Sequence, residues 1–424
     1  MSGLSVHIAP AVLPVTGPPL AEGAVAVEKG SILEVGRARL LVDRFPGAEM
    51  IKWDGVLIPG LVNAHTHLQY TSLAAVGSTN YPSYVTWSER FVAEYEGRSG
   101  DDWAASARTG LEAGLASGTT AFADIVTDVV ALGVLTAAGV AGVAYVELIG
   151  VDEDSWHRRV KQRTIDMIRS VPVTDHTRVG LSPHAPYSVD RPVLMEAATL
   201  ARQLGVRIHT HLAESDTEDA YYRYGNGALA ERVTLRVGRP WSILAHGGAG
   251  VGAAEFARSC GLLGPDSHVA HGVYLGAEGR EILRRESTLV ALCPRSNLTV
   301  GIDPPPVADF LREGDLFAVG TDSLGSSPSL DLLEDAVLLH DLARKGGYRE
   351  TDLGHRLLEA ATLGGARALG LPARIGSLQP GKRADLAVFD LDPSLDGIEE
   401  RIVTMGAGRC HATVVAGEIR HRVR

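Results

Sequence analysis

The chain has 424 residues, of which 45% are hydrophobic and 21% are charged, a composition that is ordinary for a globular protein and excludes intrinsic disorder. Its formal net charge of -11 argues against a nucleic-acid partner, because phosphate backbones are bound by basic surfaces. The three cysteines, Cys260, Cys293 and Cys410, are too few and too widely spaced for a disulfide framework, which indicates a reducing compartment.

The N-terminal stretch does not resemble a targeting signal. It lacks a basic leading segment and is interrupted by prolines, unlike a secretory signal peptide. No uninterrupted apolar run reaches ~18 residues, the length that a membrane-spanning helix needs. We therefore expect a cytoplasmic protein with no membrane partner.

Short apolar alternations broken by Gly and Pro mark both ends of the chain, and such alternations predict β-strands. They cover residues 6–9, 23–28, 31–36, 384–390, 403–405 and 412–416. Because both ends are rich in predicted strands and the middle is not, we expect one small β-sandwich domain that combines residues 1–57 with residues 371–424.

Between residues 58 and 370 the pattern changes to predicted strands that alternate with predicted helices. The strand candidates are residues 58–65, 119–125, 140–148, 178–182, 206–211, 267–270, 288–292 and 316–320, and helical segments include residues 103–117, 193–204 and 279–285. Strands that alternate with helices predict an α/β fold with a parallel sheet. Eight such units indicate a (β/α)8 barrel of the TIM type, with its chemistry at the carboxyl ends of the strands.

Polar residues gather at those predicted strand ends. They are His65 and His67, His184, His209, His211 and Glu214, His271, and Asp322. Residues i and i+2 of a strand project to the same side, so His65 and His67 can hold one cation together. Taken alone, this histidine pair is about as compatible with packed or solvated side chains as with a metal site, and the other strand ends favour the metal site.

These motifs resemble the amidohydrolase superfamily, in its single-metal deaminase and chlorohydrolase branch. The resemblance covers nearly the whole chain and rests on the motifs AVAVEKGSILEVG, PGLVNAHTHL, HTHLAES, HGVYL, CPRSNL, GTDS and IGSLQPGKRADLAVFD. It implies that His65, His67, His211 and Asp322 hold one divalent metal. This donor set suits Zn2+ and, less exclusively, Fe2+ or Mn2+. Two-metal members commonly carry a lysine at the end of strand 4, where this chain has His184 instead.

The resemblance also implies the catalytic roles. Asp322 holds or accepts the proton of the attacking water, His271 orients the hydroxide, and Glu214 carries protons to the ring nitrogen and to the leaving ammonia. His184 contacts the substrate. Two residues have alternatives: Glu214 could be a surface charge at a helix start, which the other motifs disfavour, and His209 could be a ligand, although a supporting hydrogen-bond role is favoured.

Substrate contacts are expected mainly from the aromatic segment that follows the first barrel strand, residues 69–96, because loops carry specificity in barrels. Gln69 and Trp87 are the individual residues predicted to touch the substrate, and Asn297 is a third candidate beyond strand 7. Any one aromatic side chain of this segment could instead pack a helix against the barrel.

The resemblance implies hydrolysis of an exocyclic group on a small aminated heterocycle or nucleoside. Within the family the chain looks most like purine-nucleoside deaminases, particularly those that act on 6-amino-6-deoxyfutalosine in the futalosine route to menaquinone, or on adenosine. Deamination of S-adenosylhomocysteine, methylthioadenosine, guanine or cytosine, and triazine hydrolysis, are the alternatives. A non-catalytic binding module with a structural metal is disfavoured, because such sites usually close all four positions with Cys and His. Family resemblance also makes a homodimer possible.

Overall fold

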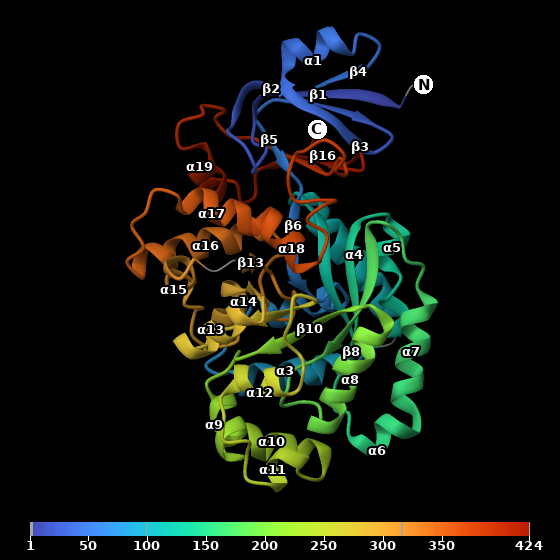
Figure 1. Ribbon diagram of the computed structural model, residues 1–424, viewed down its shortest axis with the longest axis vertical. Coiled ribbons are helices and arrows are strands. Elements are labelled where there is room, and N and C mark those ends of the chain that lie inside the picture. Colours follow the sequence, from blue (N-terminus) through green and yellow to red (C-terminus); the bar gives the residue numbers. More distant parts are fainter. Residues whose placement is uncertain (1–2, 99, 315–316, 424) are drawn as a thin grey trace.

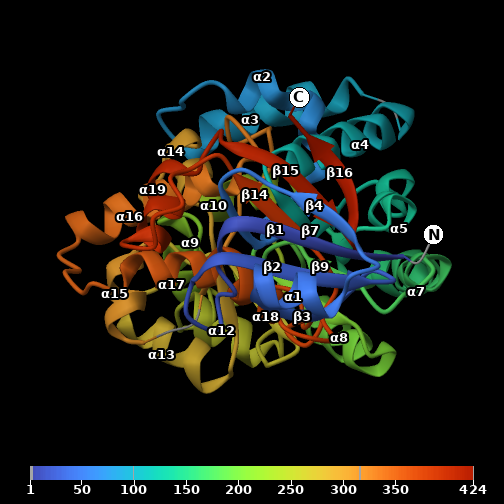
Figure 2. The same cartoon turned by 90° about the horizontal axis from the view of Figure 1, so that it is seen from above.

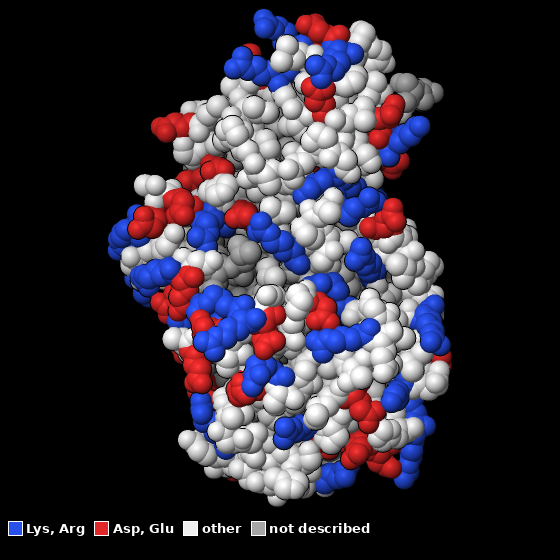
Figure 3. Space-filling model, in the orientation of Figure 1, with Lys and Arg blue, Asp and Glu red and all other residues white. Residues whose placement is uncertain are grey.

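The computed structural model describes residues 3–98, 100–314 and 317–423. Figure 1 shows two parts along the long axis: a small β-rich part with both chain ends, above a larger barrel surrounded by helices. Seen from above, the strands of the small part lie across the barrel (Figure 2). Figure 3 shows acidic and basic side chains interspersed on this face of the molecule. No helix of the described residues has the length and apolar character needed to cross a membrane.

The small part is one eight-stranded sheet to which both ends of the chain contribute. Its strands are β1 (Leu4–Val12), β2 (Leu20–Glu28), β3 (Ser31–Arg37), β4 (Glu49–Lys52), β5 (Val56–Pro59), β14 (Leu386–Phe389), β15 (Cys410–Val415) and β16 (Glu418–Arg422). Their order is β16-β15-β14-β5-β1-β2-β3, with β4 paired to β1. Val12 and Val25 share an apolar cluster with Leu386 and Val414, so the two chain ends are packed together.

One sequence prediction in this part was wrong, and one helix was missed. Residues 403–405 do not form a strand but end the helix α19 (Ile398–Met405). Ile398, Ile402 and Val403 lie on its one buried face, a spacing of four and five residues that suits a helix better than a strand. The helix α1 (Ala38–Arg44), which buries Leu41, was not predicted.

The predicted strand over residues 58–65 is divided at Gly60. β5 ends at Pro59 and pairs with β14 and β1 in the small sheet, whereas β6 begins at Leu61 and belongs to the barrel. A Cβ atom on Gly60 would lie 2.1 Å from Oγ1 of Thr120, so only glycine fits where the chain passes from one sheet to the other.

The barrel has eight parallel strands that follow one another in chain order. They are β6 (Leu61–Thr66), β7 (Thr119–Val126), β8 (Ala141–Leu148), β9 (Thr177–Pro183), β10 (Arg207–Leu212), β11 (Ser267–His271), β12 (Leu289–Leu292) and β13 (Phe317–Val319). Leu316, the first residue of the predicted eighth strand, lies outside the described residues. The backbone N–H of Asp322, beyond β13, donates to the carbonyl of His65 on β6 at 3.0 Å, which joins the last strand to the first. The barrel prediction is confirmed.

Helices follow the strands and cover the barrel (Figure 1). They are α2 (Ala74–Gly77), α3 (Tyr84–Glu96), α4 (Gly100–Ala116), α5 (Val134–Ala138), α6 (Glu153–Ser155), α7 (Lys161–Ser170), α8 (Arg191–Leu204), α9 (Thr217–Tyr224), α10 (Ala228–Val237), α11 (Ser242–Ala245), α12 (Ala253–Ser259), α13 (Ala277–Arg285), α14 (Pro294–Thr299), α15 (Val307–Arg312), α16 (Leu332–Lys345), α17 (Leu353–Glu359) and α18 (Gly365–Ala368). In α8, the side chain of Asp190 caps the first turn, and Gly205 ends the helix at a φ of 66°.

Candidate active site

Three histidines from two strands converge at the carboxyl end of the barrel. His65 lies near the end of β6, His67 follows that strand directly, and His211 lies on β10. One ring nitrogen from each of the three lies within 4.8 Å of the others, and all three residues are buried. One ligand atom from each of His65, His271 and Asp322 also lies within 4.8 Å of the other two. The structure therefore brings the four predicted metal ligands together in one cluster.

A chain of hydrogen bonds determines which nitrogen of His65 faces this cluster. The carbonyl oxygen of His268 can only accept, so Nδ1 of His209, at 3.1 Å, carries a proton. Nε2 of the neutral His209 then accepts from Nδ1 of His65 at 2.8 Å. The lone pair of His65 consequently lies on Nε2, the nitrogen that faces Asp322. His209 thus supports His65 rather than joining the ligands.

His211 is oriented in the same way. Its Nδ1 donates to the carbonyl of His184 at 2.7 Å, which leaves the lone pair on Nε2. Burial lowers the pKa of His65, of His67 (to about 4) and of His211, so all three imidazoles are neutral at neutral pH. Neutral imidazole is the form that binds a metal.

The two oxygens of the Asp322 carboxylate have different surroundings. Oδ1 lies 3.5 Å from Nε2 of both His65 and His67, whereas Oδ2 accepts from the hydroxyls of Ser296 and Ser326 at 2.7 and 2.8 Å. Burial favours a raised pKa, but the contacts of the carboxylate with the imidazoles of His65, His67 and His271 outweigh burial and hold the pKa of Asp322 well below its usual value. Asp322 therefore presents one anionic oxygen to the histidines.

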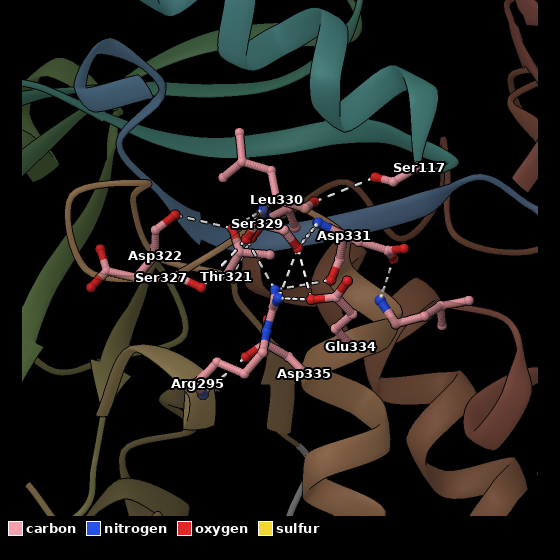
Figure 4. A network of polar contacts seen from close by, with 12 residues as sticks. Ser117, Arg295, Thr321, Asp322, Ser327, Ser329, Leu330, Asp331, Glu334 and Asp335 are labelled. Atoms are coloured by element: carbon pink, nitrogen blue, oxygen red, sulfur yellow. Dashed lines mark hydrogen bonds and ion pairs between the residues drawn. The ribbon is translucent and has the colours of Figure 1, made fainter. Parts of the chain in front are cut away.

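Arg295 holds the segment that follows Asp322 against the helix α16. Its guanidinium donates to the Asp335 carboxylate at 2.7 Å, to Ser329 Oγ at 2.8 Å, and to the carbonyls of Ser329 and Asp331 at 3.0 Å. It also pairs with Glu334. Figure 4 shows these groups gathered around Arg295 beside Asp322 and Thr321. Arg295 thus ties residues 329–335, a few positions beyond Asp322, to one another and to the start of α16.

The donor set fits one divalent cation. Three imidazole nitrogens and one carboxylate oxygen suit Zn2+ and, less exclusively, Fe2+ or Mn2+. Nε2 of His65 is buried without a hydrogen-bond partner among the described residues, as expected for an atom that ligates a metal.

Glu214 and His271 lie beside the cluster. Oε1 of Glu214 is 3.7 Å from Nε2 of His271, and both side chains are buried. Burial, assisted by the charges of Asp322 and Glu218, raises the pKa of Glu214 well above its usual value, whereas burial lowers the pKa of His271 to about 3. An acid that keeps its proton near neutral pH can donate that proton to a substrate.

Glu218 is a residue that the sequence analysis missed. Its carboxylate accepts the backbone N–H groups of Ala213, Glu214 and Ser215 at 2.9, 2.7 and 3.1 Å. Ala213 has a φ of 51°, a conformation that needs support from its surroundings. Glu218 therefore positions the loop that carries Glu214. Its place in the first turn of α9 was the available signal, because carboxylates there often bind backbone N–H groups.

A cavity with two connected chambers leads to the cluster. The inner chamber, of about 100 Å³, is lined by His67, His211, Glu214 and Asp322. The outer chamber, of about 230 Å³, is largely aromatic and apolar, with Arg232 and Arg236 of α10 in its wall. His184, Trp87, Tyr70 and Tyr84 line both chambers. His184 and Trp87 thus line the cavity, and their contact with substrate stays a prediction.

Gln69 and Asn297 do not line either chamber. Oε1 of Gln69 accepts the backbone N–H groups of Thr127 and Asp128, both at 3.1 Å, so this amide supports a loop. Asn297 is 0% exposed, and its amide has no hydrogen-bond partner among the described residues. Contact of these two residues with substrate stays a prediction. Glu147, Tyr187, Arg232 and Arg236, which line the cavity, were not predicted.

The model of the amidohydrolase family matches residues 56–420. Among curated relatives, a 5-methylthioadenosine/S-adenosylhomocysteine deaminase from Moorella thermoacetica is 32% identical over 418 residues, covering 95% of this chain and 90% of the relative. A protein of the same name from Haloarcula marismortui is 30% identical over 384 residues, covering 88% and 82%.

Solved structures agree with these matches. An adenosine deaminase from Xanthomonas campestris with bound zinc has a TM-score of 0.80 and 25% identity, covering 98% of this chain and 92% of that one. Aminofutalosine deaminase from Helicobacter pylori has a TM-score of 0.83, 20% identity and coverage of 99% and 100%, and this likeness shows the fold alone.

Proposed function

The chain belongs to the amidohydrolase family, and from that membership we propose that it is a metal-dependent deaminase of 6-aminopurine nucleosides. The reaction replaces the 6-amino group by oxygen and releases ammonia. Curated relatives at 30% identity or more are named as deaminases of 5-methylthioadenosine and S-adenosylhomocysteine, which supports this reaction.

One observation carries the proposal. Three neutral imidazoles and one carboxylate converge at the inner end of a cavity, with a buried acid and a further histidine beside them. His65, His67, His211 and Asp322 would hold the cation, for which we propose Zn2+, with Fe2+ or Mn2+ as alternatives. A divalent metal supplies hydroxide at neutral pH by lowering the pKa of water toward about 7.

The remaining steps fall to side chains of this chain. Asp322 accepts one proton of the attacking water, and Glu214 donates its proton to the ring nitrogen N1 while the hydroxide oxygen adds to C6. The Glu214 carboxylate then takes the proton of the new C6 hydroxyl and passes it to the amine, so that the C6–N bond breaks, ammonia leaves and the 6-oxo product forms; the proton held by Asp322 returns Glu214 to its acid form. His271 faces Glu214 and the ligand cluster, where it orients the attacking oxygen. His184, which lines the wall next to His211, contacts the purine ring.

The outer chamber favours nucleosides with an extended 5′ substituent. Its wall is aromatic and apolar, and it includes Arg232, whose Nη1 is buried without a hydrogen-bond partner among the described residues. An apolar substituent that ends in a carboxylate suits this wall better than the 5′-hydroxyl of adenosine does. 6-Amino-6-deoxyfutalosine has this character, and S-adenosylhomocysteine shares the terminal carboxylate but also carries an ammonium group. Turnover of the second compound would place the enzyme in menaquinone biosynthesis.

The test is ammonia release from a panel after reconstitution with Zn2+. The panel contains adenosine, 5′-methylthioadenosine, S-adenosylhomocysteine, 6-amino-6-deoxyfutalosine, guanine, cytosine and a chlorotriazine. We expect turnover of the adenine nucleosides, and a loss of roughly 100- to 10,000-fold in Glu214→Gln with the metal retained. Unchanged turnover in Glu214→Gln would refute the mechanism, and turnover of guanine or the triazine alone would refute the substrate assignment.

Metal analysis separates the enzyme from a metal-stabilised binding module. We expect about one equivalent of metal per chain, and loss of turnover on chelation that returns when Zn2+ is restored. A protein that holds the metal but turns over no compound of the panel would favour the binding module. The homodimer stays a prediction, which sedimentation would test.

A further inference from the structure

Seven residues line both chambers of the cavity and therefore mark the junction between them. They are Tyr70, Tyr84, Trp87, Phe91, Glu147, Ile149 and His184. Among these, Glu147, near the end of β8, is the carboxylate. A nucleoside has the same linear order as the cavity: the base reacts in the inner chamber beside Glu214, the 5′ substituent extends into the outer chamber, and the ribose lies between them. Glu147 is thus placed at the level of the sugar.

Hydrogen bonds hold Glu147 in place but leave acceptor capacity. The hydroxyl of Thr127 donates to Oε2 of Glu147 at 2.5 Å, and the phenol of Tyr70 lies 2.6 Å from the same threonine oxygen. Tyr70 therefore donates to Thr127, and Thr127 donates to Glu147. Among the described residues, the Thr127 hydroxyl is the one hydrogen-bond donor to this carboxylate, so Oε1 remains available as an acceptor.

Glu147 is half-buried at the cavity wall, and a ligand that covers it excludes water from a carboxylate with few donors, which is costly unless the ligand completes the hydrogen bonds. Burial raises the pKa of Glu147 to about 7, although the hydrogen bond from Thr127 opposes this shift. A structural carboxylate in the same protein looks different: Glu218 accepts three backbone N–H groups. The cavity side of Glu147 can receive the two hydroxyl donors of a vicinal diol.

We propose that Glu147 accepts hydrogen bonds from the 2′- and 3′-hydroxyls of the substrate ribose and thereby selects ribonucleosides over 2′-deoxynucleosides and free bases. This inference rests on the proposed function, because it takes a 6-aminopurine nucleoside as the substrate. Tyr70 and Thr127 act as positioning residues that fix the rotamer of Glu147.

The test compares adenosine, 2′-deoxyadenosine and adenine as substrates of the zinc enzyme. We expect kcat/KM to be roughly 10- to 100-fold lower for 2′-deoxyadenosine than for adenosine, with most of the difference in KM. In Glu147→Gln this ratio should fall to about threefold or less, because the 2′-hydroxyl then loses its charged partner. Thr127→Val should reduce the ratio less, and Thr127→Ser should preserve it. Glu153→Gln, on the exposed helix α6, is the matched control and should leave the ratio unchanged.

Equal losses for adenosine and 2′-deoxyadenosine in Glu147→Gln would overturn the inference, because a merely structural glutamate affects both substrates alike. A wild-type enzyme that does not distinguish the two substrates would overturn it as well. Should Glu147→Gln fail to fold, the ratio of kcat/KM for adenosine to that for 2′-deoxyadenosine in Thr127→Val and in the wild type still tests the inference. Ammonia release from none of the adenine compounds would instead refute the proposed function, and the inference with it.

Discussion

Nδ1 of His65 lies 2.8 Å from Nε2 of His209, a residue 144 positions later in the chain. His209 is in turn held by the carbonyl of His268, and its ring stacks on the His268 ring with centroids 3.7 Å apart. The nitrogen of His65 that faces Asp322 is therefore selected by His209, a residue outside the cluster of candidate ligands.

Replacing His209 by Phe should weaken metal binding. The variant keeps a ring of similar size but removes the acceptor for His65 Nδ1, so that His65 loses the hydrogen bond that fixes its tautomer. We expect the dissociation constant for Zn2+ to rise roughly 10- to 100-fold, measured by competition with a chromophoric chelator. His246→Gln, which changes an exposed histidine, is the control. Equal affinity in the wild type and His209→Phe would contradict the role assigned to this hydrogen bond.

Replacing Glu218 by Gln should lower kcat and spare metal binding. Glutamine places an N–H group against one of the three backbone donors, so the loop that carries Glu214 shifts. Small displacements of a catalytic group slow the reaction strongly, and we expect kcat to fall roughly 10- to 100-fold with KM little changed. Steady-state kinetics with metal analysis checks this, and Asp219→Asn at the exposed neighbouring position is the control. A kcat within twofold of the wild type would show that the loop keeps its shape without Glu218.

Replacing Arg295 by Met should destabilise the fold. Asp335 is 0% exposed and depends on Arg295 for a bond of 2.7 Å, so the substitution leaves an unpaired charge in the interior (Figure 4). Breaking such a pair costs about 3–5 kcal/mol of unfolding free energy. Urea denaturation measures the change, and Arg258→Met, which breaks an exposed pair with Glu255, should have little effect. If the double variant Arg295→Met/Asp335→Leu is as unstable as the single one, the unpaired carboxylate is not the cause.

His7 should make the stability of the small sheet depend on pH. Burial lowers its pKa to about 4, and Nδ1 of the neutral ring accepts from the Trp53 indole at 3.2 Å. The unfolded chain binds a proton near pH 6.5 and the folded one near pH 4, so stability is complete above pH 6.5 and decreases as the pH falls toward 4.

The difference between the two pKa values corresponds to a loss of about 3 kcal/mol of unfolding free energy between pH 6.5 and pH 4. His7→Gln removes the ionisable group, and the unfolding free energy of this variant should depend less steeply on pH between 6.5 and 4 than that of the wild type. Urea titrations at several pH values provide the measurement. Parallel pH dependence in the two proteins would assign the acid sensitivity to other groups.

Much of the fold and of the site could be read from the sequence because the relevant signals are local. Alternating strands and helices predicted the barrel, and the spacing of His65 and His67 is a consequence of the strand repeat itself. His211, Glu214, His271 and Asp322 each follow or end a recognisable apolar run, so their convergence followed from the barrel geometry. The family prediction, which rested on these motifs, is confirmed by the match over residues 56–420.

The tertiary structure decided what depends on contacts between distant segments. The sequence around Gly60 reads as one continuous strand, and only the close approach of Thr120 shows why the chain leaves one sheet for the other there. Glu218 and Glu147 are ordinary acidic residues in the sequence. Only the structure shows that Glu218 accepts backbone N–H groups and that Glu147 lines the cavity. The sequence therefore determined which side chains meet at the end of the barrel. The structure determined how they are oriented, because hydrogen-bond partners and burial arise only when the strands are assembled.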